Sequence, residues 1–151
     1  GIMAAPKWIA QACDKMQGQF TSGTCSITQK AMHAAMELPA ESTHYMRDAF
    51  LNRRNLVLEL MKEIPGFKTN VPDGAFYVYP EVSALFGKSY NGFTINNATD
   101  LSMFLLDVAH VALVPGAAFG DDKYIRFSYA TSEDKLTEAL KRMKEAIEKL
   151  K

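Results

Sequence analysis

The chain has 151 residues, of which 48% are apolar and 23% are charged, and its 17 basic and 17 acidic side chains cancel. This composition is typical of a globular protein with its own core and excludes a disordered chain, nucleic acid as a partner and attraction to an anionic membrane. No apolar run is long enough to span a bilayer and the N-terminus lacks a signal-peptide pattern, so we expect a cytoplasmic protein.

Two helices are predicted in the first forty residues. Pro6 suits the first turn of a helix, and an apolar face follows it at helical spacing, formed by Trp8, Ile9, Ala12 and Met16. A polar loop at residues 17–24 precedes a second helix that begins at Ser26, whose hydroxyl can cap it while Gln29 reaches back. The chain opens with "GIMAAPKWIA", as though it continued an element begun earlier, so we expect a fragment of a longer protein.

Helices mixed with short strands are predicted after Pro39. The longest helical pattern ends at "IPG", residues 64–66, because proline cannot continue the helical ladder. "FKTN" and "GAFYVYP" read as strands around the turn "VPDG", and Thr99 or Asp100 can cap the helix after them. "VALVPG" reads as a short buried strand whose partner is "YIRFSYA". A final amphipathic helix points four apolar side chains inward, namely Leu136, Leu140, Met143 and Ile147.

These elements predict an α+β fold. Strands mixed with long helices, in no strict alternation, favour a two-layer sandwich in which helices cover a short mixed or antiparallel sheet of three or four strands. Pro39 interrupts the helical pattern. We therefore expect a domain boundary there, with residues 1–38 and 39–151 in different domains.

The cysteines and histidines give no sign of a metal site. Cys13 and Cys25 are too few for a disulfide framework, and the three histidines have no carboxylate or thiol at ligand spacing. We expect no bound metal, and we expect both thiols to be reduced and buried.

Arg126 stands in the middle of the predicted strand "YIRFSYA". The period of two residues gives this strand an apolar face, formed by Ile125, Phe127 and Tyr129, and puts Arg126 on the other face. An arginine is costly to bury unpaired, and its planar guanidinium matches a carboxylate with two parallel hydrogen bonds. The alternative is a solvated arginine or a structural ion pair, and the pattern alone favours that alternative.

Three other segments hold residues that could line a ligand site. Glycines let a loop approach a ligand closely, an aromatic ring can form a pocket wall, and hydroxyls ahead of a helix N-terminus favour an anion. Ordinary turns, a hairpin and helix capping explain the same residues equally well. The candidates are Thr21, Ser22 and Gly23 in "QFTSGTCS", Gly74 and Phe76 in "PDGAFYVYP", and Gly116 and Gly120 in "VPGAAFG".

Five segments follow one another in a specific order along the chain. They are "APKWI", "GQFTSGTCSITQKA", "NVPDGAFYVYP", "ATDLSMFLLDVAHVALVPGAAFG" and "YIRFSYATSEDKLTEALKRM". Taken in this order they resemble the C-terminal part of the pyridoxal-phosphate-dependent aminotransferases of fold type I, and most closely the class I aspartate aminotransferase group. The resemblance covers essentially the whole chain and is much less specific as to substrate.

The resemblance assigns roles to the candidate residues. It implies that Arg126, in the "IRxSxA" strand, grips the α-carboxylate of an amino acid substrate and so holds its Cα in the geometry for proton abstraction. It implies that Gly74, Ala75 and Phe76 form a pocket wall. It implies that Gly116 and Phe119 belong to a loop beside the active site. It also implies that Thr21, Ser22 and Gly23 belong to a loop that approaches the neighbouring subunit of a homodimer.

The resemblance also implies a cofactor, pyridoxal phosphate, which serves as an electron sink while an amino group moves between an amino acid of the aspartate or glutamate type and a 2-oxo acid. Aromatic, prephenate-type and alanine substrates remain open. The Schiff-base lysine of the family precedes the glycine that matches Gly1, and none of the lysines present, Lys7 included, matches it.

Residues 1–38 are then expected to be a remnant of the large cofactor-binding domain, and residues 39–151 the small domain. We expect the isolated chain to be inactive and not to hold the cofactor covalently. The alternative is a non-catalytic α+β module that binds amino acids or another protein.

Overall fold

The chain divides between His44 and Tyr45 into two units. The computed structural model describes residues 2–151. The predicted domain boundary, between residues 38 and 39, lies shortly before this division. The assignment of the first unit to a larger domain stays a prediction.

The first unit consists of α1 (Lys7–Phe20), α2 (Ser26–Glu37) and the 3₁₀ turn η1 (Ala40–Thr43). α1 follows Pro6, as predicted, but continues to Phe20 through half of the expected loop. α2 begins at Ser26, as predicted, yet Ser26 makes no capping bond. Instead, the Gln29 side-chain Nε2 donates a hydrogen bond to the Thr24 carbonyl oxygen at 2.8 Å.

Neither helix of the first unit buries a residue. Large apolar side chains therefore stay exposed on both helices, among them Trp8, Met16, Phe20, Ile27 and Met36. Cys13 and Cys25 are exposed for the same reason, so the prediction that both thiols are buried is wrong. Both helices form where the sequence pattern predicted them, but other residues of this unit cover no face of either helix.

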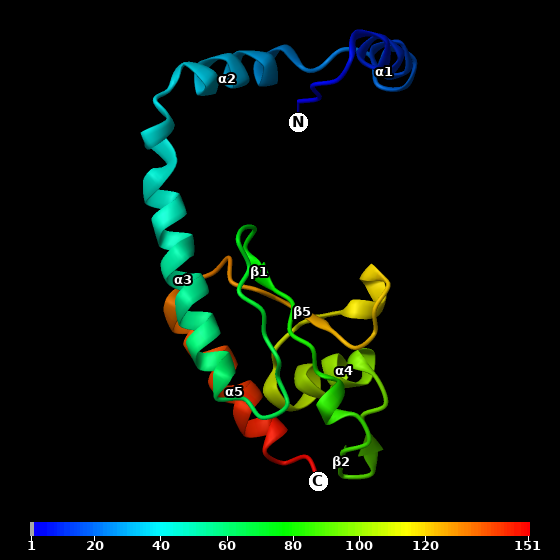
Figure 1. Cartoon of the computed structure of the whole chain (residues 1–151), viewed down its shortest axis with the longest axis vertical. Coiled ribbons are helices and arrows are strands. Elements are labelled where there is room, and N and C mark those ends of the chain that lie inside the picture. The colour runs from blue at the N-terminus through cyan, green and yellow to red at the C-terminus, as the bar shows by residue number, and fades with distance from the viewer. Residues whose placement is uncertain (1) are drawn as a thin grey trace. The chain divides into compact units, whose positions relative to one another are not determined.

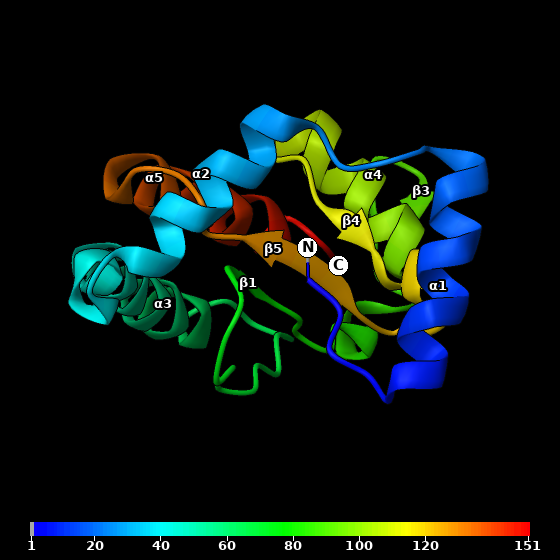
Figure 2. The same cartoon turned by 90° about the horizontal axis from the view of Figure 1, so that it is seen from above.

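The second unit is built on a three-stranded antiparallel sheet with the order β1-β5-β4. Its strands are β1 (Tyr77–Val78), β4 (Val114–Pro115) and β5 (Ile125–Ser128), which lie side by side in Figure 2. The predicted pairing of "VALVPG" with "YIRFSYA" is confirmed by the register Val114 to Arg126. A separate hairpin joins β2 (Ser89–Tyr90) to β3 (Phe93–Thr94).

The hairpin predicted around "VPDG" is largely wrong. An isolated bridge joins Lys68 of "FKTN" to Glu81, the residue after "GAFYVYP", and these two described segments form no ladder with each other. "GAFYVYP" instead contributes β1, which pairs with β5, so Tyr77 is opposite Ser128 and Val78 is opposite Phe127. The sheet thus takes a partner about fifty residues away in place of the adjacent segment.

Three helices cover the apolar face of the sheet: α3 (His44–Lys62), α4 (Ala98–Ala109) and α5 (Glu133–Ile147). α4 and α5 pack against each other (Figure 1). The predicted inward face of α5 is confirmed, since all four of its residues are buried. The core joins these residues to others from α3, α4 and the sheet, including Val57, Met61, Leu101, Phe104, Leu105, Val78, Ile125 and Phe127. The predicted α+β fold, with helices over a short antiparallel sheet, is therefore confirmed.

Asn97, rather than Thr99 or Asp100, caps α4. Its side chain accepts a hydrogen bond from the Asp100 amide at 2.9 Å, and Asp100 Oδ2 in turn accepts one from the Asn96 amide at 2.9 Å. The cap of α4 therefore lies two residues before Thr99 and three before Asp100, and its reciprocal hydrogen bonds satisfy the Asn96 and Asp100 amides.

Within residues 2–151 no helix is long and apolar enough to cross a membrane. The same described range contains no group of three or more histidine, cysteine, aspartate or glutamate side chains that could hold a metal ion.

Candidate functional site

Arg126 lies on the central strand of the sheet, on the face opposite the core. Its neighbours Ile125 and Phe127 are buried, whereas Arg126 is half-buried and Ser128 is exposed. The alternation predicted from the sequence is therefore confirmed for this strand. Because β5 runs between β1 and β4, the Arg126 side chain is flanked by residues from two other segments.

Two aromatic rings lie against the Arg126 guanidinium. Its central carbon is 5.2 Å from the centroid of the Tyr77 ring and 4.8 Å from that of the Phe119 ring. Tyr77 is on β1, and Phe119 ends η3 (Gly116–Phe119), the 3₁₀ turn directly after β4. With Tyr79 these residues line a hollow of about 240 Å³.

The guanidinium has no hydrogen-bond or ion-pair partner among the residues that the structure describes. Asp121, an acidic residue in the loop after η3, instead accepts a hydrogen bond from the Lys123 amide at 3.1 Å. Arginine stays protonated at any physiological pH and carries five N–H donors in a planar fork. The hollow therefore presents a positive charge with all of its donors unused.

Tyr79 braces the loop that carries Phe119. Its ring stacks on Tyr124 at 5.0 Å and meets the Phe119 ring edge-on at 6.1 Å. Its hydroxyl can donate to the Gly116 carbonyl oxygen, 3.4 Å away, or to that of Asp121, 3.5 Å away. Removal from water, with Asp121 and then Tyr124 as smaller causes, raises the pKa of the Tyr79 hydroxyl.

Gly116 is required by the close approach of backbone and ring at this point. A Cβ atom there would lie 2.0 Å from the Asp121 carbonyl oxygen and 2.6 Å from both the Tyr124 carbonyl oxygen and the Tyr79 hydroxyl. Gly120 ends the turn with a φ of 90°, in the left-handed region that favours glycine. Glycine at 116 thus lets the loop fold tightly enough to bring Phe119 over Arg126.

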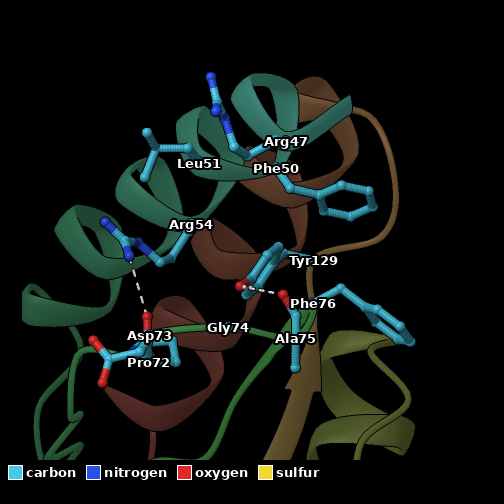
Figure 3. A pocket seen from close by; sticks show the side chains of 10 residues that line it. All are labelled: Arg47, Phe50, Leu51, Arg54, Pro72, Asp73, Gly74, Ala75, Phe76 and Tyr129. Carbon is cyan, nitrogen blue, oxygen red and sulfur yellow. Dashed lines mark hydrogen bonds between the residues drawn. The ribbon is translucent and has the colours of Figure 1, made fainter. Parts of the chain in front are cut away.

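A second hollow, of about 330 Å³, lies between α3 and the loop before β1 (Figure 3). Gly74, Ala75 and Phe76, the predicted pocket wall, line this second hollow and not the one at Arg126. The Phe76 ring does contact Tyr77, with centroids 5.5 Å apart at 84°, so the two hollows share an aromatic boundary.

Hydrogen bonds to the backbone fix the walls of the second hollow. Arg54 Nη1 donates to the Pro72 carbonyl oxygen at 3.1 Å, and the Tyr129 hydroxyl donates to that of Ala75 at 3.0 Å. In Figure 3 the Arg54 side chain points towards the loop, while Arg47 points away from it. Arg47 pairs with the adjacent Asp48 at 2.8 Å, so it has a partner already.

Thr21, Ser22 and Gly23 belong to the first unit, where they are exposed. Ser22 has a φ of 59°, and the Thr21 hydroxyl accepts a hydrogen bond from the Gln17 side chain. Their predicted approach to the active site of a neighbouring subunit stays a prediction.

Tyr77 and Tyr79 were not among the residues predicted from the sequence. Both lie in "GAFYVYP", and their period-two spacing puts them on one face of the strand. That spacing was a usable signal, but the identity of the partner strand was needed to bring the pair to Arg126.

The family model for aminotransferase class I and II matches residues 1–143. The chain belongs to the class I and II aminotransferase family. The resemblance noted in the sequence is therefore confirmed at the level of the family.

Aminotransferases from several organisms match nearly all of this chain. A bifunctional aspartate aminotransferase and glutamate/aspartate-prephenate aminotransferase from Petunia hybrida is 45% identical over 155 residues, 100% of this chain and 32% of the relative. An aspartate aminotransferase from Rhizobium meliloti strain 1021 is 39% identical over 99% of this chain and 37% of the relative. This aminotransferase chain thus spans about a third of the length of the curated relatives it matches.

Solved aminotransferases share the fold. The crystal structure of the aspartate aminotransferase from Rhizobium meliloti matches with a TM-score of 0.93 and 38% identity, over 98% of this chain and 37% of that one. The aromatic aminotransferase from Pyrococcus horikoshii OT3 matches with a TM-score of 0.83 and 32% identity, over 96% and 37%.

Proposed function

We propose that the whole protein to which this chain belongs is a pyridoxal-phosphate-dependent aminotransferase, and that Arg126 binds the α-carboxylate of its amino acid substrate. Family membership supports the activity. The observation that carries the role of Arg126 is its half-buried guanidinium, which lies between two rings and has no partner among the described residues.

A carboxylate fits the chemistry of this hollow. A guanidinium can donate two parallel N–H bonds to the two oxygens of a carboxylate, and such charge-assisted bonds are roughly twice as strong as neutral ones. The rings of Tyr77 and Phe119 contact the guanidinium and leave its N–H donors available to such a carboxylate. A substrate held by its carboxylate has its Cα fixed in position, which favours proton removal from that carbon.

The lining of the hollow does not fit the cofactor itself. Among the described residues it contains one cation and three rings, with neither a lysine to form a Schiff base nor an acid to pair with a pyridine nitrogen. In aminotransferases the cofactor supplies the electron sink. This chain's own contribution is the grip on the substrate, and no chemical step on the cofactor is assigned to its residues.

We propose, accordingly, that no lysine of this chain bonds covalently to pyridoxal phosphate. The isolated chain is incubated with the cofactor, reduced with borohydride and measured by mass spectrometry. We expect no stoichiometric adduct at a single lysine. An adduct that forms at one lysine in every molecule would contradict this assignment.

Aspartate is the proposed amino donor and 2-oxoglutarate the proposed acceptor. The names of the Petunia and Rhizobium relatives support aspartate, and the name of the Petunia relative also supports a prephenate-type acceptor. A homodimer, which the resemblance implies, and a cytoplasmic location, which the sequence pattern suggests, are further proposals. Light scattering of the purified full-length protein would test the first of these two.

The test of the activity is amino-group transfer by the full-length protein loaded with cofactor. Aspartate, alanine or phenylalanine labelled with ¹⁵N is supplied with 2-oxoglutarate or prephenate, and ¹⁵N-labelled glutamate is supplied with prephenate. We expect the label in the amino acid formed from the acceptor. If no donor passes its amino group to any 2-oxo acid, the proposed activity is wrong.

A further inference from the structure

Arg126 is held without an acidic partner. A charged side chain that lies half-buried on a sheet is usually held by an opposite charge. Here the nearest described partners of the guanidinium are the rings of Tyr77, at 5.2 Å, and Phe119, at 4.8 Å. Both distances are within the range at which an aromatic face attracts a cation.

The sheet register explains why the two rings reach Arg126 from separate elements. Tyr77 is opposite Ser128, and Ser128 shares its strand face with Arg126, so Tyr77 is the diagonal neighbour of Arg126 on that face. Val114 of β4 is opposite Arg126 on the other side, and the turn after β4 carries Phe119. The two rings therefore belong to segments that flank β5 on either edge.

A ring and an acid hold an arginine with different consequences. A carboxylate would occupy the N–H donors of the guanidinium and would compete with an incoming anion. An aromatic face attracts the cation through its π-electrons and uses none of the five N–H donors. An arginine held in this way is fixed in place and still has its full capacity to bind a carboxylate.

We propose that Tyr77 and Phe119 are positioning residues. Their rings do what an ion pair would otherwise do, and hold the Arg126 guanidinium in position to bind a carboxylate. Tyr79 supports Phe119, because its ring meets that of Phe119 edge-on and its hydroxyl lies within reach of the Gly116 carbonyl oxygen at the start of the same turn. This inference rests on the proposed carboxylate-binding role of Arg126, and it assigns functions to two tyrosines outside the predicted site.

The experiment measures the order parameter of the Arg126 Nε–H group by NMR relaxation of the ¹⁵N-labelled chain. The signal of this group is assigned as the one that disappears in Arg126→Lys. Phe119→Leu and Tyr77→Leu keep apolar bulk and remove the aromatic face. We expect the order parameter of this group to fall in both variants, to below about 0.6, the range of flexible groups. Phe119→Tyr and Tyr77→Phe should preserve it. Phe93→Leu, which removes an aromatic ring that is 44% exposed on β3, is the matched control.

A titration with succinate separates this proposal from the proposed function. We expect succinate to shift the Arg126 Nε–H resonance of the unaltered chain, and to bind about 3- to 30-fold more weakly to the two leucine variants, the range of a lost cation–π contact. An unchanged order parameter in both leucine variants overturns the positioning role. If the order parameter falls as expected but succinate shifts no resonance of the unaltered chain, the positioning stands and the carboxylate role fails.

Discussion

The hydroxyl of Tyr129 donates a hydrogen bond to the carbonyl oxygen of Ala75 at 3.0 Å, across 54 residues of sequence. The Tyr129 amide also donates to the Phe76 carbonyl oxygen at 2.8 Å. Ala75 has a φ of 64°, which an alanine adopts only when its surroundings hold it there. These bonds therefore fix the loop that leads into β1, and with it the position of Tyr77.

Tyr129→Phe should lower the free energy of unfolding of the second unit by about 1 kcal/mol, because it removes one hydrogen bond and leaves the Ala75 carbonyl without its partner. Urea unfolding followed by circular dichroism measures the change. Tyr45→Phe is the control, since Tyr45 is 72% exposed. Equal stabilities of the two variants would contradict the role of this bond.

Gly116→Ala should be far more destabilising than its size suggests. The added Cβ would lie 2.0 Å from the Asp121 carbonyl oxygen, so the turn after β4 must shift, at a cost of about 1 to 3 kcal/mol or more. Gly74→Ala is the matched control, because nothing lies within 4 Å of a Cβ at that position. The account of this turn would be wrong if thermal unfolding showed both variants to be equally stable.

Two tyrosines should ionise at unusually high pH. Removal from water raises the pKa of both Tyr79 and Tyr129, and Asp121 adds to the effect at Tyr79. A phenol whose pKa is higher in the folded state than in the unfolded state stabilises the fold fully below its ordinary pKa of about 10, and this contribution is lost as the pH rises above that value.

Absorbance at the tyrosinate band is the measurement. Of the six tyrosines in the chain, Tyr79 and Tyr129 should contribute to the last part of the alkaline titration. Tyr79→Phe and Tyr129→Phe should each remove part of that late change. A late phase that both variants leave intact would contradict the assignment.

Backbone amides of the first unit should exchange with deuterium much faster than those of the second. Neither α1, with 14 residues, nor α2, with 12, buries any side chain, and helices of this length are marginal in water without packing. Amides of α4 and α5, whose inner faces are buried, should be protected. Protection in α1 equal to that in α5 would show that the first unit is stabilised by contacts other than those described.

Local periodicity was sufficient to predict β5 and α5. The alternation around Arg126 and the buried face of the last helix follow from spacing alone, since each element has one apolar face and one polar face. The fold class followed from the order of these elements. Arg126 was found in the same way. A charged side chain in the middle of a strand of alternating apolar residues is costly to bury, so it stands out in the sequence.

The pairing of β1 with β5 could not be predicted. The local turn signal "VPDG" favoured a hairpin, yet β1 pairs with β5 instead. Phe76 and Tyr77 are adjacent, so period two sends their side chains to different sides, and only Tyr77 reaches Arg126. A difference of one residue, between Phe76 and Tyr77, thus separates the predicted pocket wall from the hollow at Arg126.

The central claim is that Arg126 recognises a carboxylate, and a double cycle on the full-length protein tests it most directly. The ratio of kcat/KM for L-aspartate to that for its α-amide is measured in the unaltered enzyme and in Arg126→Ala, with Arg142→Ala as the control, since Arg142 pairs with Glu138 on α5. We predict a coupling between Arg126 and the α-carboxylate of at least about 1.5 kcal/mol, which is roughly a 12-fold loss of preference for the acid in Arg126→Ala only. If Arg126→Ala keeps the full preference for the acid over the amide, Arg126 does not bind the α-carboxylate.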